Sequence, residues 1–165
     1  MIVMCLDPSL RNTGLAVLET KDNGLPNKIV HKETLKTSFS KGDAEYVQIG
    51  NAIANLQVLF KKYDPALVVS EIPYGAQSFK GAVSVGYSMA ISAMLKAYPV
   101  RPQSIAEMIK GYTGNDKKAK SIQFVAERLY TPAAFWNKDE MNHIADAICA
   151  YYVYLSREKL LNFEK

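Results

Sequence analysis

The first apolar stretch of the chain covers residues 2–6 and shows no alternation of polar and apolar positions. A run of this kind is typical of a strand that is covered on both faces of a sheet. Asp7 ends the run, and turn-forming residues follow it, namely Pro8, Ser9, Asn12 and Gly14. The pattern predicts a carboxylate at the end of a buried strand. Taken alone, it also fits a strand that simply ends in an aspartate turn.

Two more strands are predicted over about residues 14–19 and 28–35. The connection between them includes residues 21–24, whose Asn-Gly pair is a strong hairpin signal. Because short turns link all three strands, the pattern predicts an antiparallel meander.

A helix and a fourth strand are predicted after the meander. Beyond Asp43, a candidate N-cap, apolar residues recur at helical spacing up to about Tyr63. Residues 66–70 then form another apolar run, which ends at Glu71. Because a helix usually connects parallel strands, this strand is predicted to lie parallel to the first one. Asp7 and Glu71 would then share the edge at which open α/β sheets form their sites.

Residues 81–98 are predicted to form a helix, and no charged residue occurs between positions 81 and 95. One narrow polar stripe runs along it at a spacing of four residues, formed by Ser84, Ser88, Ser92 and Lys96. A helix with so little charge is buried on more than one side. Burial in the core alone is one interpretation. Burial against both the core and a second copy of the chain explains the breadth of the apolar surface better.

The densest positive charge in the chain follows two short predicted elements. Residues 99–102 suggest an edge strand, and residues 104–107 resemble a capping box for a short helix that Gly111 ends. The basic cluster comprises Lys110, Lys117, Lys118 and Lys120. Three of these lysines fall in the first turn of a predicted helix, where they oppose the helix dipole at a cost in stability. Contact with phosphate explains this placement better than a solvated loop does.

The last helix is predicted from about Asp139 through residue 161. His143 and Asp146 are three positions apart, so they project from one face of it. Asp146 lies among apolar residues that are expected to be buried, and a buried acid requires a partner.

The composition favours one domain, over residues 1–165, with a sizeable core. Hydrophobic residues make up 48% of the chain and charged residues 22%, which argues against disorder. The net charge is +4, and it becomes +7 if a metal neutralises Asp7, Glu71 and Asp146. This bias favours an anionic partner. Cys5 and Cys149 lie in apolar runs, like buried thiols in a reducing compartment. No signal peptide or membrane-length run is evident, so a soluble, cytoplasmic protein is expected.

Three acidic residues are therefore predicted to share one site. Carboxylates repel one another unless a cation joins them, and Mg²⁺ prefers oxygen ligands. Two such ions, ~4 Å apart, can activate a water and stabilise the leaving oxygen of an in-line phosphoryl displacement. These residue types indicate phosphodiester hydrolysis, with the lysines holding the phosphate backbone.

Four segments, in their order and spacing, resemble the RuvC-type Holliday junction resolvases, which have the ribonuclease H-like fold. The segments are LDPSLRNTGLAVLE, VVSEIPY, KGYTGNDKKAK and HIADAICAYY. The resemblance spans essentially the whole chain. It implies an α/β fold with a mixed sheet of about five strands flanked by helices. It also implies a homodimeric, Mg²⁺-dependent endonuclease that nicks a four-way DNA junction in pairs. Because imidazole suits Mn²⁺ better than Mg²⁺, His143 would let Mn²⁺ substitute. A compact, divergent chain of this kind would suit a phage-encoded member.

The resemblance also assigns roles to residues. Asp7, Glu71 and Asp146 correspond to metal ligands, and His143 stands at the fourth position, where many members carry Asp. Tyr74 matches an aromatic residue that family members wedge into the junction centre. Lys110 and Lys120 approximate basic residues near the scissile strand. The sequence of the loop after the fourth strand, EIPYGAQSFKG, differs from the usual family sequence. The resemblance therefore implies no cleavage-sequence preference for this chain.

Three other functions fit parts of the pattern. A related nuclease acting on RNA/DNA hybrids or on branched DNA in general would use the same four residues, although Tyr74 and the uncharged helix favour a dimeric junction enzyme. An actin-like ATPase or sugar kinase also opens with a strand, an aspartate and a polar turn, but it needs two such domains. A non-catalytic junction-binding protein would have no reason to retain all the acids.

Overall fold

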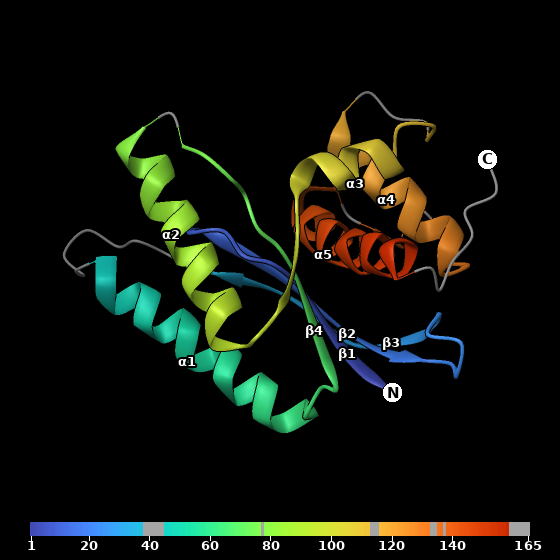
Figure 1. Cartoon of the computed structure of the whole chain (residues 1–165), viewed down its shortest axis with the longest axis horizontal. Helices are drawn as coiled ribbons and strands as arrows, with labels where there is room; N and C mark the ends of the chain where they lie inside the picture. The colour runs from blue at the N-terminus through green and yellow to red at the C-terminus, as the bar shows by residue number, and fades with distance from the viewer. Residues whose placement is uncertain (38–44, 77, 113–115, 133–134, 137, 159–165) are drawn as a thin grey trace.

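A five-stranded mixed sheet separates two layers of helices (Figure 1). The computed structural model describes residues 1–165 except 38–44, 77, 113–115, 133–134, 137 and 159–165. In sheet order the strands are β3 (Pro26–Lys36), β2 (Asn12–Thr20), β1 (Ile2–Asp7), β4 (Leu67–Glu71) and β5 (Tyr98–Val100). The central strand β1 pairs antiparallel with β2 and parallel with β4. The predicted meander, the crossover and the short edge strand are confirmed.

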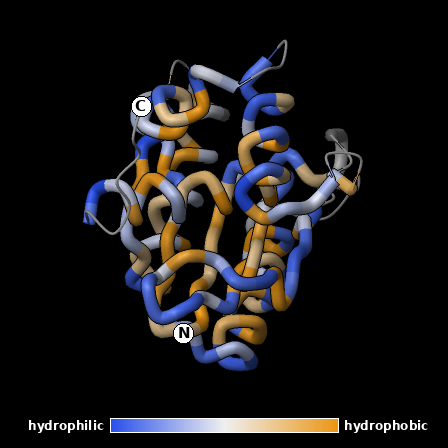
Figure 2. The backbone as a smooth tube through the Cα atoms, turned by 90° about the vertical axis from the view of Figure 1, so that its right-hand side faces the viewer, coloured by the Kyte–Doolittle hydropathy of each residue, from blue (hydrophilic) through white to orange (hydrophobic). Residues whose placement is uncertain are grey.

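The helices divide between the two faces of the sheet (Figure 1). On one face lie α1 (Glu45–Tyr63) and α2 (Phe79–Met94). On the other lie α3 (Pro102–Met108), α4 (Lys117–Arg128) and α5 (Lys138–Arg157). Hydrophobic segments run through the centre of the molecule, and hydrophilic ones lie mostly at its ends and edges (Figure 2). None of the helices in the described part of the chain is both long and apolar enough to cross a membrane.

Each face of the sheet has its own apolar core, which explains why β1 is apolar without alternation. Met4 and Leu6 pack in the core beneath α1 and α2. Val3 and Cys5 pack in the core beneath α5, and all four side chains are fully buried. A strand with this much burial on both faces holds its last residue, Asp7, in a fixed place.

The turn between β2 and β3 confirms the predicted hairpin. Gly24 has a φ of +81°, and its N–H donates to the carbonyl of Lys21. This backbone conformation favours glycine, as the Asn-Gly pair indicated. Gly14, which was counted among the turn residues and also predicted to begin the second strand, lies within β2 and pairs with Asp7.

Several helix boundaries differ from the predictions, and two of the differences have a clear structural cause. The helix predicted over residues 81–98 ends at Met94, because Lys96 adopts a left-handed φ of +51° and the chain turns into β5. The predicted capping box is wrong: Arg101 is the N-cap of α3, no side chain caps it, and Ser104 lies inside the helix. Pro102 begins that helix, where a missing N–H carries no penalty. The predicted N-cap Asp43 lies outside the described residues.

Candidate active site

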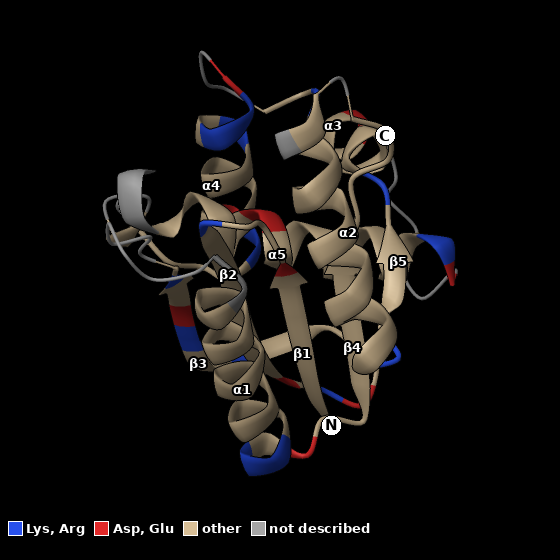
Figure 3. Ribbon diagram, turned by 90° about the vertical axis from the view of Figure 1, so that its left-hand side faces the viewer, with Lys and Arg blue, Asp and Glu red and all other residues tan. Residues whose placement is uncertain are grey.

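Three carboxylates meet at the ends of β1 and β4, beneath α5. Asp7 and Glu71 are the last residues of their strands, which run parallel and so end at the same edge of the sheet. Asp146 comes from α5, which packs across β1 and β4. Each residue offers an oxygen, and these oxygens all lie within 4.8 Å of one another. In Figure 3 the acidic tip of β1 lies next to an acidic stretch of α5, with the basic start of α4 above them. The structure therefore brings together the three residues that the sequence predicts to share one site.

Lys117, the first residue of α4, enters this cluster. Its Nζ lies 3.2 Å from Oε1 of Glu71 and 3.5 Å from Oδ2 of Asp146. Burial by itself would lower the pKa of Lys117, but the charges of Asp146 and Glu71 raise it. The lysine is therefore held as a cation between two carboxylates. Its predicted contact with DNA phosphate remains a prediction.

One ammonium group does not satisfy all the acceptors of the cluster. Oε2 of Glu71 is buried and has no hydrogen-bond partner among the residues that the structure describes. Burial, and then the charge of Asp7, raise the pKa of Glu71 to about 8. An acceptor of this kind, beside two other carboxylates, fits a divalent cation that takes oxygen ligands. The donor set therefore suits the magnesium that the resemblance implies.

Asp146 is positioned by a serine from the neighbouring helix. The hydroxyl of Ser121 donates to Oδ1 of Asp146 over 2.5 Å, and both residues are buried. Burial raises the pKa of Asp146, whereas Lys117 and Ser121 counteract that effect. Sequence reasoning missed Ser121. The only feature of the sequence that could have indicated Ser121 is its position, a polar residue one turn after Lys117 among the apolar residues that α4 buries.

His143 bonds to Asp7, at the other side of the cluster. Its Nδ1 lies 2.7 Å from Oδ2 of Asp7. This hydrogen bond raises the pKa of His143 despite partial burial, which acts in the opposite direction. The carboxylate that His143 orients is therefore on β1, although Asp146 is its neighbour on the helix.

Gly14 explains how His143 can approach the strands so closely. A Cβ atom at this position would collide with the backbone carbonyl of His143. Only a glycine therefore lets α5 lie against β2 at this point. Because Gly14 also pairs with Asp7, the same residue brings together the two groups of the His143–Asp7 hydrogen bond.

The serine stripe of α2 faces inward and anchors the helix to both site-bearing strands. The hydroxyl of Ser88 donates to the carbonyl of Pro8, directly after Asp7. The hydroxyl of Ser92 donates to Ser70, directly before Glu71. Sequence reasoning identified the stripe but gave it no role. It holds the two strand ends at fixed positions relative to α2.

Several of the remaining predicted residues lie close to Lys117 or His143. Lys110 and Lys120 line a cavity of about 240 Å³ together with Lys117. Lys118 lies close enough to His143 to affect its titration. Tyr74 is 53% exposed in the loop after β4, and the guanidinium carbon of Arg101 lies 5.0 Å from its ring centre. The structure thus gathers the predicted basic residues on the side of the carboxylates.

Protonation of the site predicts how pH affects the metal-free protein. The raised pKa values of Glu71 and His143 mean that the folded state binds their protons more tightly than the unfolded state does. Their contribution to the free energy of unfolding is present at low pH and is lost as the pH rises. For Glu71 this loss takes place between its ordinary pKa of 4.5 and its raised pKa of about 8. A divalent cation needs the deprotonated carboxylates, so Mg²⁺ should stabilise the protein more at pH 8 than at pH 6. We expect a difference of about 1–2 kcal/mol, or roughly 2–8 °C in Tm.

Thermal unfolding with millimolar Mg²⁺ or with chelator, at both pH values, measures this difference. Glu71→Gln is the control, because it should remove most of the Mg²⁺ effect. An equal Mg²⁺ effect at pH 6 and pH 8 would show that cations do not bind at these carboxylates.

The order of the strands and the placement of the helices define the fold. A mixed sheet of this order, flanked by these five helices, is the ribonuclease H-like fold. Within that class the chain has the fold of the Holliday junction resolvases. Thermus thermophilus RuvC, in complex with a Holliday junction substrate, is similar over 97% of both chains, with 18% identity and a TM-score of 0.74.

Two other resolvases share the fold. For the fowlpox virus resolvase in complex with Holliday junction DNA, the similarity covers 98% of this chain and all of that chain, with 17% identity and a TM-score of 0.59. The yeast mitochondrial Holliday junction resolvase is similar over 96% of this chain and 79% of its own chain, with 14% identity and a TM-score of 0.64. Neither a protein-family model nor a curated protein sequence matches the chain.

Proposed function

We propose that this protein is a metal-dependent endonuclease that resolves four-way DNA junctions by paired phosphodiester hydrolysis. The observation that carries the proposal is the cluster of Asp7, Glu71 and Asp146. It is placed by two parallel strand ends and one helix within a fold shared with RuvC in complex with a Holliday junction. A cluster of carboxylates with an orphaned acceptor suits phosphodiester chemistry better than simple binding of DNA.

The metal ligands would be the three carboxylates, together with His143. When bound, two Mg²⁺ ions would supply an activated water and stabilise the leaving oxygen. Imidazole also suits Mn²⁺ well, so Mn²⁺ should support cleavage at least as well as Mg²⁺. Ser121 would keep Asp146 in its orientation, and Gly14 would allow His143 to reach Asp7.

The basic residues around the carboxylates would bind the substrate backbone. Lys110, Lys118 and Lys120 would neutralise phosphates on either side of the scissile one. The ammonium of Lys117 already offsets charge between Glu71 and Asp146, so it would lie next to a phosphate bound at these carboxylates. Lys117 would then donate to that oxygen.

Homodimer formation is part of the proposal, and its evidence is the outer face of α2. Phe79, Met89 and Met94 are exposed there, and no charged residue interrupts this face between Gly81 and Met94. An uncharged face of this kind fits a second copy of the chain. A two-fold dimer would present one site to each of two opposed strands of the junction.

Gly86→Glu should prevent dimerisation. Gly86 is exposed on this face, and a Cβ atom there would meet nothing within 4 Å in the single chain. The variant should therefore fold normally and sediment as a monomer at micromolar concentration. Gly50→Glu is a matched control on α1, also in open space, and should remain dimeric. A monomeric wild-type protein that still resolves junctions would refute the dimer.

Tyr74→Ala should weaken cleavage of four-way junctions more than cleavage of nicked or flapped duplexes. We expect a loss of about tenfold, because stacking of one base on an aromatic ring contributes roughly 1–3 kcal/mol. Tyr74 is half exposed, so its ring is accessible to a base. Rates on the three substrates measure the selectivity, and Tyr130→Ala is a control at another exposed tyrosine. Equal losses on every substrate, or a lower Tm, would indicate that Tyr74 merely packs on its own domain.

A labelled four-way junction tests the function itself. In the presence of Mg²⁺ the protein should release nicked duplexes, and with chelator it should bind the junction without cutting it. A flap, a linear duplex and an RNA/DNA hybrid with the same sequences distinguish the related nuclease functions. Faster cleavage of the hybrid than of the junction would favour a hybrid nuclease, whereas binding without cleavage under every condition would favour a structural junction-binding protein.

A further inference from the structure

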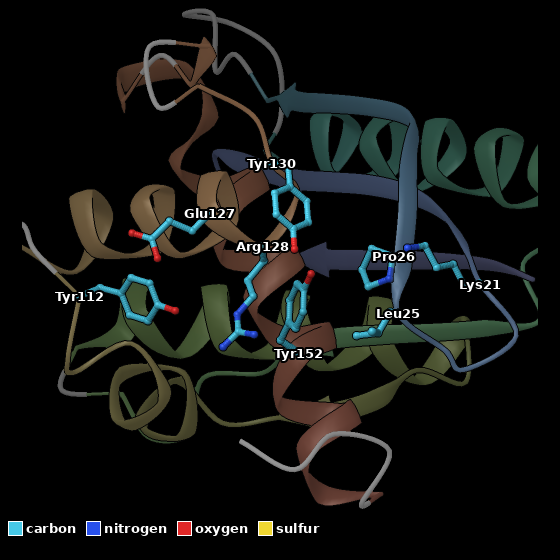
Figure 4. Close-up of a pocket in the computed structure, with 8 residues that line it drawn as sticks. All are labelled: Lys21, Leu25, Pro26, Tyr112, Glu127, Arg128, Tyr130 and Tyr152. Carbon is cyan, nitrogen blue, oxygen red and sulfur yellow. The ribbon is translucent and has the colours of Figure 1, made fainter. Parts of the chain in front are cut away.

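A second cavity lies at the opposite end of α4 from the carboxylates (Figure 4). Its volume is about 410 Å³, and all of its lining residues are among those the structure describes. Lys117 begins α4 within the acidic cluster, whereas Arg128 ends the helix in the wall of this cavity. Twelve residues of helix put these two points roughly 17 Å apart. The cavity is therefore separate from the proposed active site.

Three tyrosines give this cavity an aromatic lining. They are Tyr112, Tyr130 and Tyr152. Tyr152 belongs to α5 and is only 2% exposed, whereas Tyr130 is 96% exposed. In Figure 4 the hydroxyl groups of these two residues point toward one another. Tyr130 also has a left-handed φ of +52°, which is uncommon for an aromatic residue. Because the ring of Tyr130 is almost fully exposed and also lines the cavity, it is accessible for stacking.

Charged groups of both signs complete the lining. Arg128 and Lys21 supply the cations, from α4 and from the turn after β2. The guanidinium of Arg128 also lies 5.5 Å from the ring centre of Phe124, a contact that restricts its position. The carboxylate of Glu127 accepts a hydrogen bond from Gln123 over 2.7 Å, which orients it at the rim. The cavity thus combines anion binding, aromatic stacking and a hydrogen-bond acceptor.

We propose that this cavity binds a nucleoside monophosphate unit, either as a free nucleotide or as part of a single strand. The base would stack on Tyr130, and Arg128 and Lys21 would hold the phosphate. Glu127 would accept a hydrogen bond from an exocyclic amino group of the base. The volume of about 410 Å³ lies within the usual range for small-ligand sites. A site for phosphate alone would gain nothing from three aromatic rings.

Calorimetric titration of the full chain in chelator tests this proposal, because without divalent metal the nucleotide has no cation through which to bind the carboxylates. The ligands are dAMP, deoxyadenosine, inorganic phosphate and a 5′-phosphorylated single strand of five deoxyadenosines. We expect dAMP to bind more tightly than deoxyadenosine or phosphate. Tyr130→Ser should weaken dAMP binding about tenfold, and Tyr130→Phe should retain it. Arg128→Gln should remove the preference for dAMP over deoxyadenosine.

Tyr74→Ser and Asp7→Asn are the controls, because they alter another exposed tyrosine and the carboxylate cluster. Both should bind dAMP like the wild type. Single-strand binding that exceeds dAMP binding and falls with Tyr130→Ser would identify the strand as the natural ligand, and the reverse order would identify the free nucleotide. No dAMP binding at millimolar concentration, equal binding of phosphate, or full retention of binding by Tyr130→Ser and Arg128→Gln would overturn the proposal. Tyr130→Ser should cleave junctions normally, so this test is independent of the proposed function.

Discussion

Asp7→Asn is expected to abolish cleavage of a four-way junction while leaving junction binding intact or tighter. Asp7 is the last residue of the central strand, and its side chain both joins the carboxylate cluster and bonds to His143. Loss of a residue that only supports a metal ligand costs about 10- to 100-fold in activity, so loss of a ligand itself should exceed a hundredfold. In the proposed function the phosphate contacts come from the lysines, which the variant retains. Asparagine keeps the shape of the side chain, so the fold should survive.

Gel-shift and cleavage assays on the same junction at fixed salt measure both properties. Asp22→Asn is a matched control, because it removes an equal charge in the β2–β3 turn, away from the cluster. Unimpaired cleavage by Asp7→Asn, or a loss of binding parallel to the loss of cleavage, would contradict the assignment of Asp7 as a metal ligand.

His143→Ala should reduce the cleavage rate at least about tenfold, the lower end of the range for losing a group that supports a metal ligand, and more than a hundredfold where the imidazole itself ligates the metal. The variant removes the 2.7 Å contact with Asp7 and a candidate metal ligand at once. His143→Asp should retain activity, since a carboxylate can ligate the metal at the same position. A full rate for His143→Ala would show that the imidazole has no part in the reaction.

The pH dependence separates a chemical role of His143 from a structural one. A protonated imidazole can neither ligate a metal nor accept a proton, and the bond to Asp7 raises the pKa of His143 above its ordinary value. At saturating Mg²⁺ the rate should rise with pH through roughly 6 to 7.5 and then level off. His143→Asp should shift this rise to lower pH. An unchanged profile in that variant would assign the rise to another group.

The strands and the carboxylates could be predicted from the sequence because both depend on local patterns. An apolar run without alternation indicates a strand that is buried on both faces. The polar residue that follows such a run must lie where the strand ends and leaves the core. Asp7 and Glu71 satisfy this rule. The Asn-Gly pair likewise determined the hairpin, since the left-handed backbone of Gly24 is a local property.

Other features of the site depend on contacts between distant segments and could not be predicted. Lys117 was identified as one of several basic residues, but only the packing of α4 against the sheet places it between two carboxylates. Gly14 was predicted to begin the second strand, but its importance comes from the backbone of α5 lying against it, which no local pattern shows. The end of α2 at Met94 was also missed, because nothing in the apolar sequence marks Lys96 as left-handed.

Cleavage of a supercoiled plasmid with an extruded cruciform tests the central claim most directly. The plasmid carries one four-way junction, and paired nicks across it convert the circle into a linear molecule in one binding event. With Mg²⁺ the wild-type protein should produce linear plasmid with both ends at the cruciform, and Asp7→Asn or chelator should leave the plasmid supercoiled. Nicks scattered over the duplex, or the same products in chelator, would contradict a metal-dependent junction resolvase.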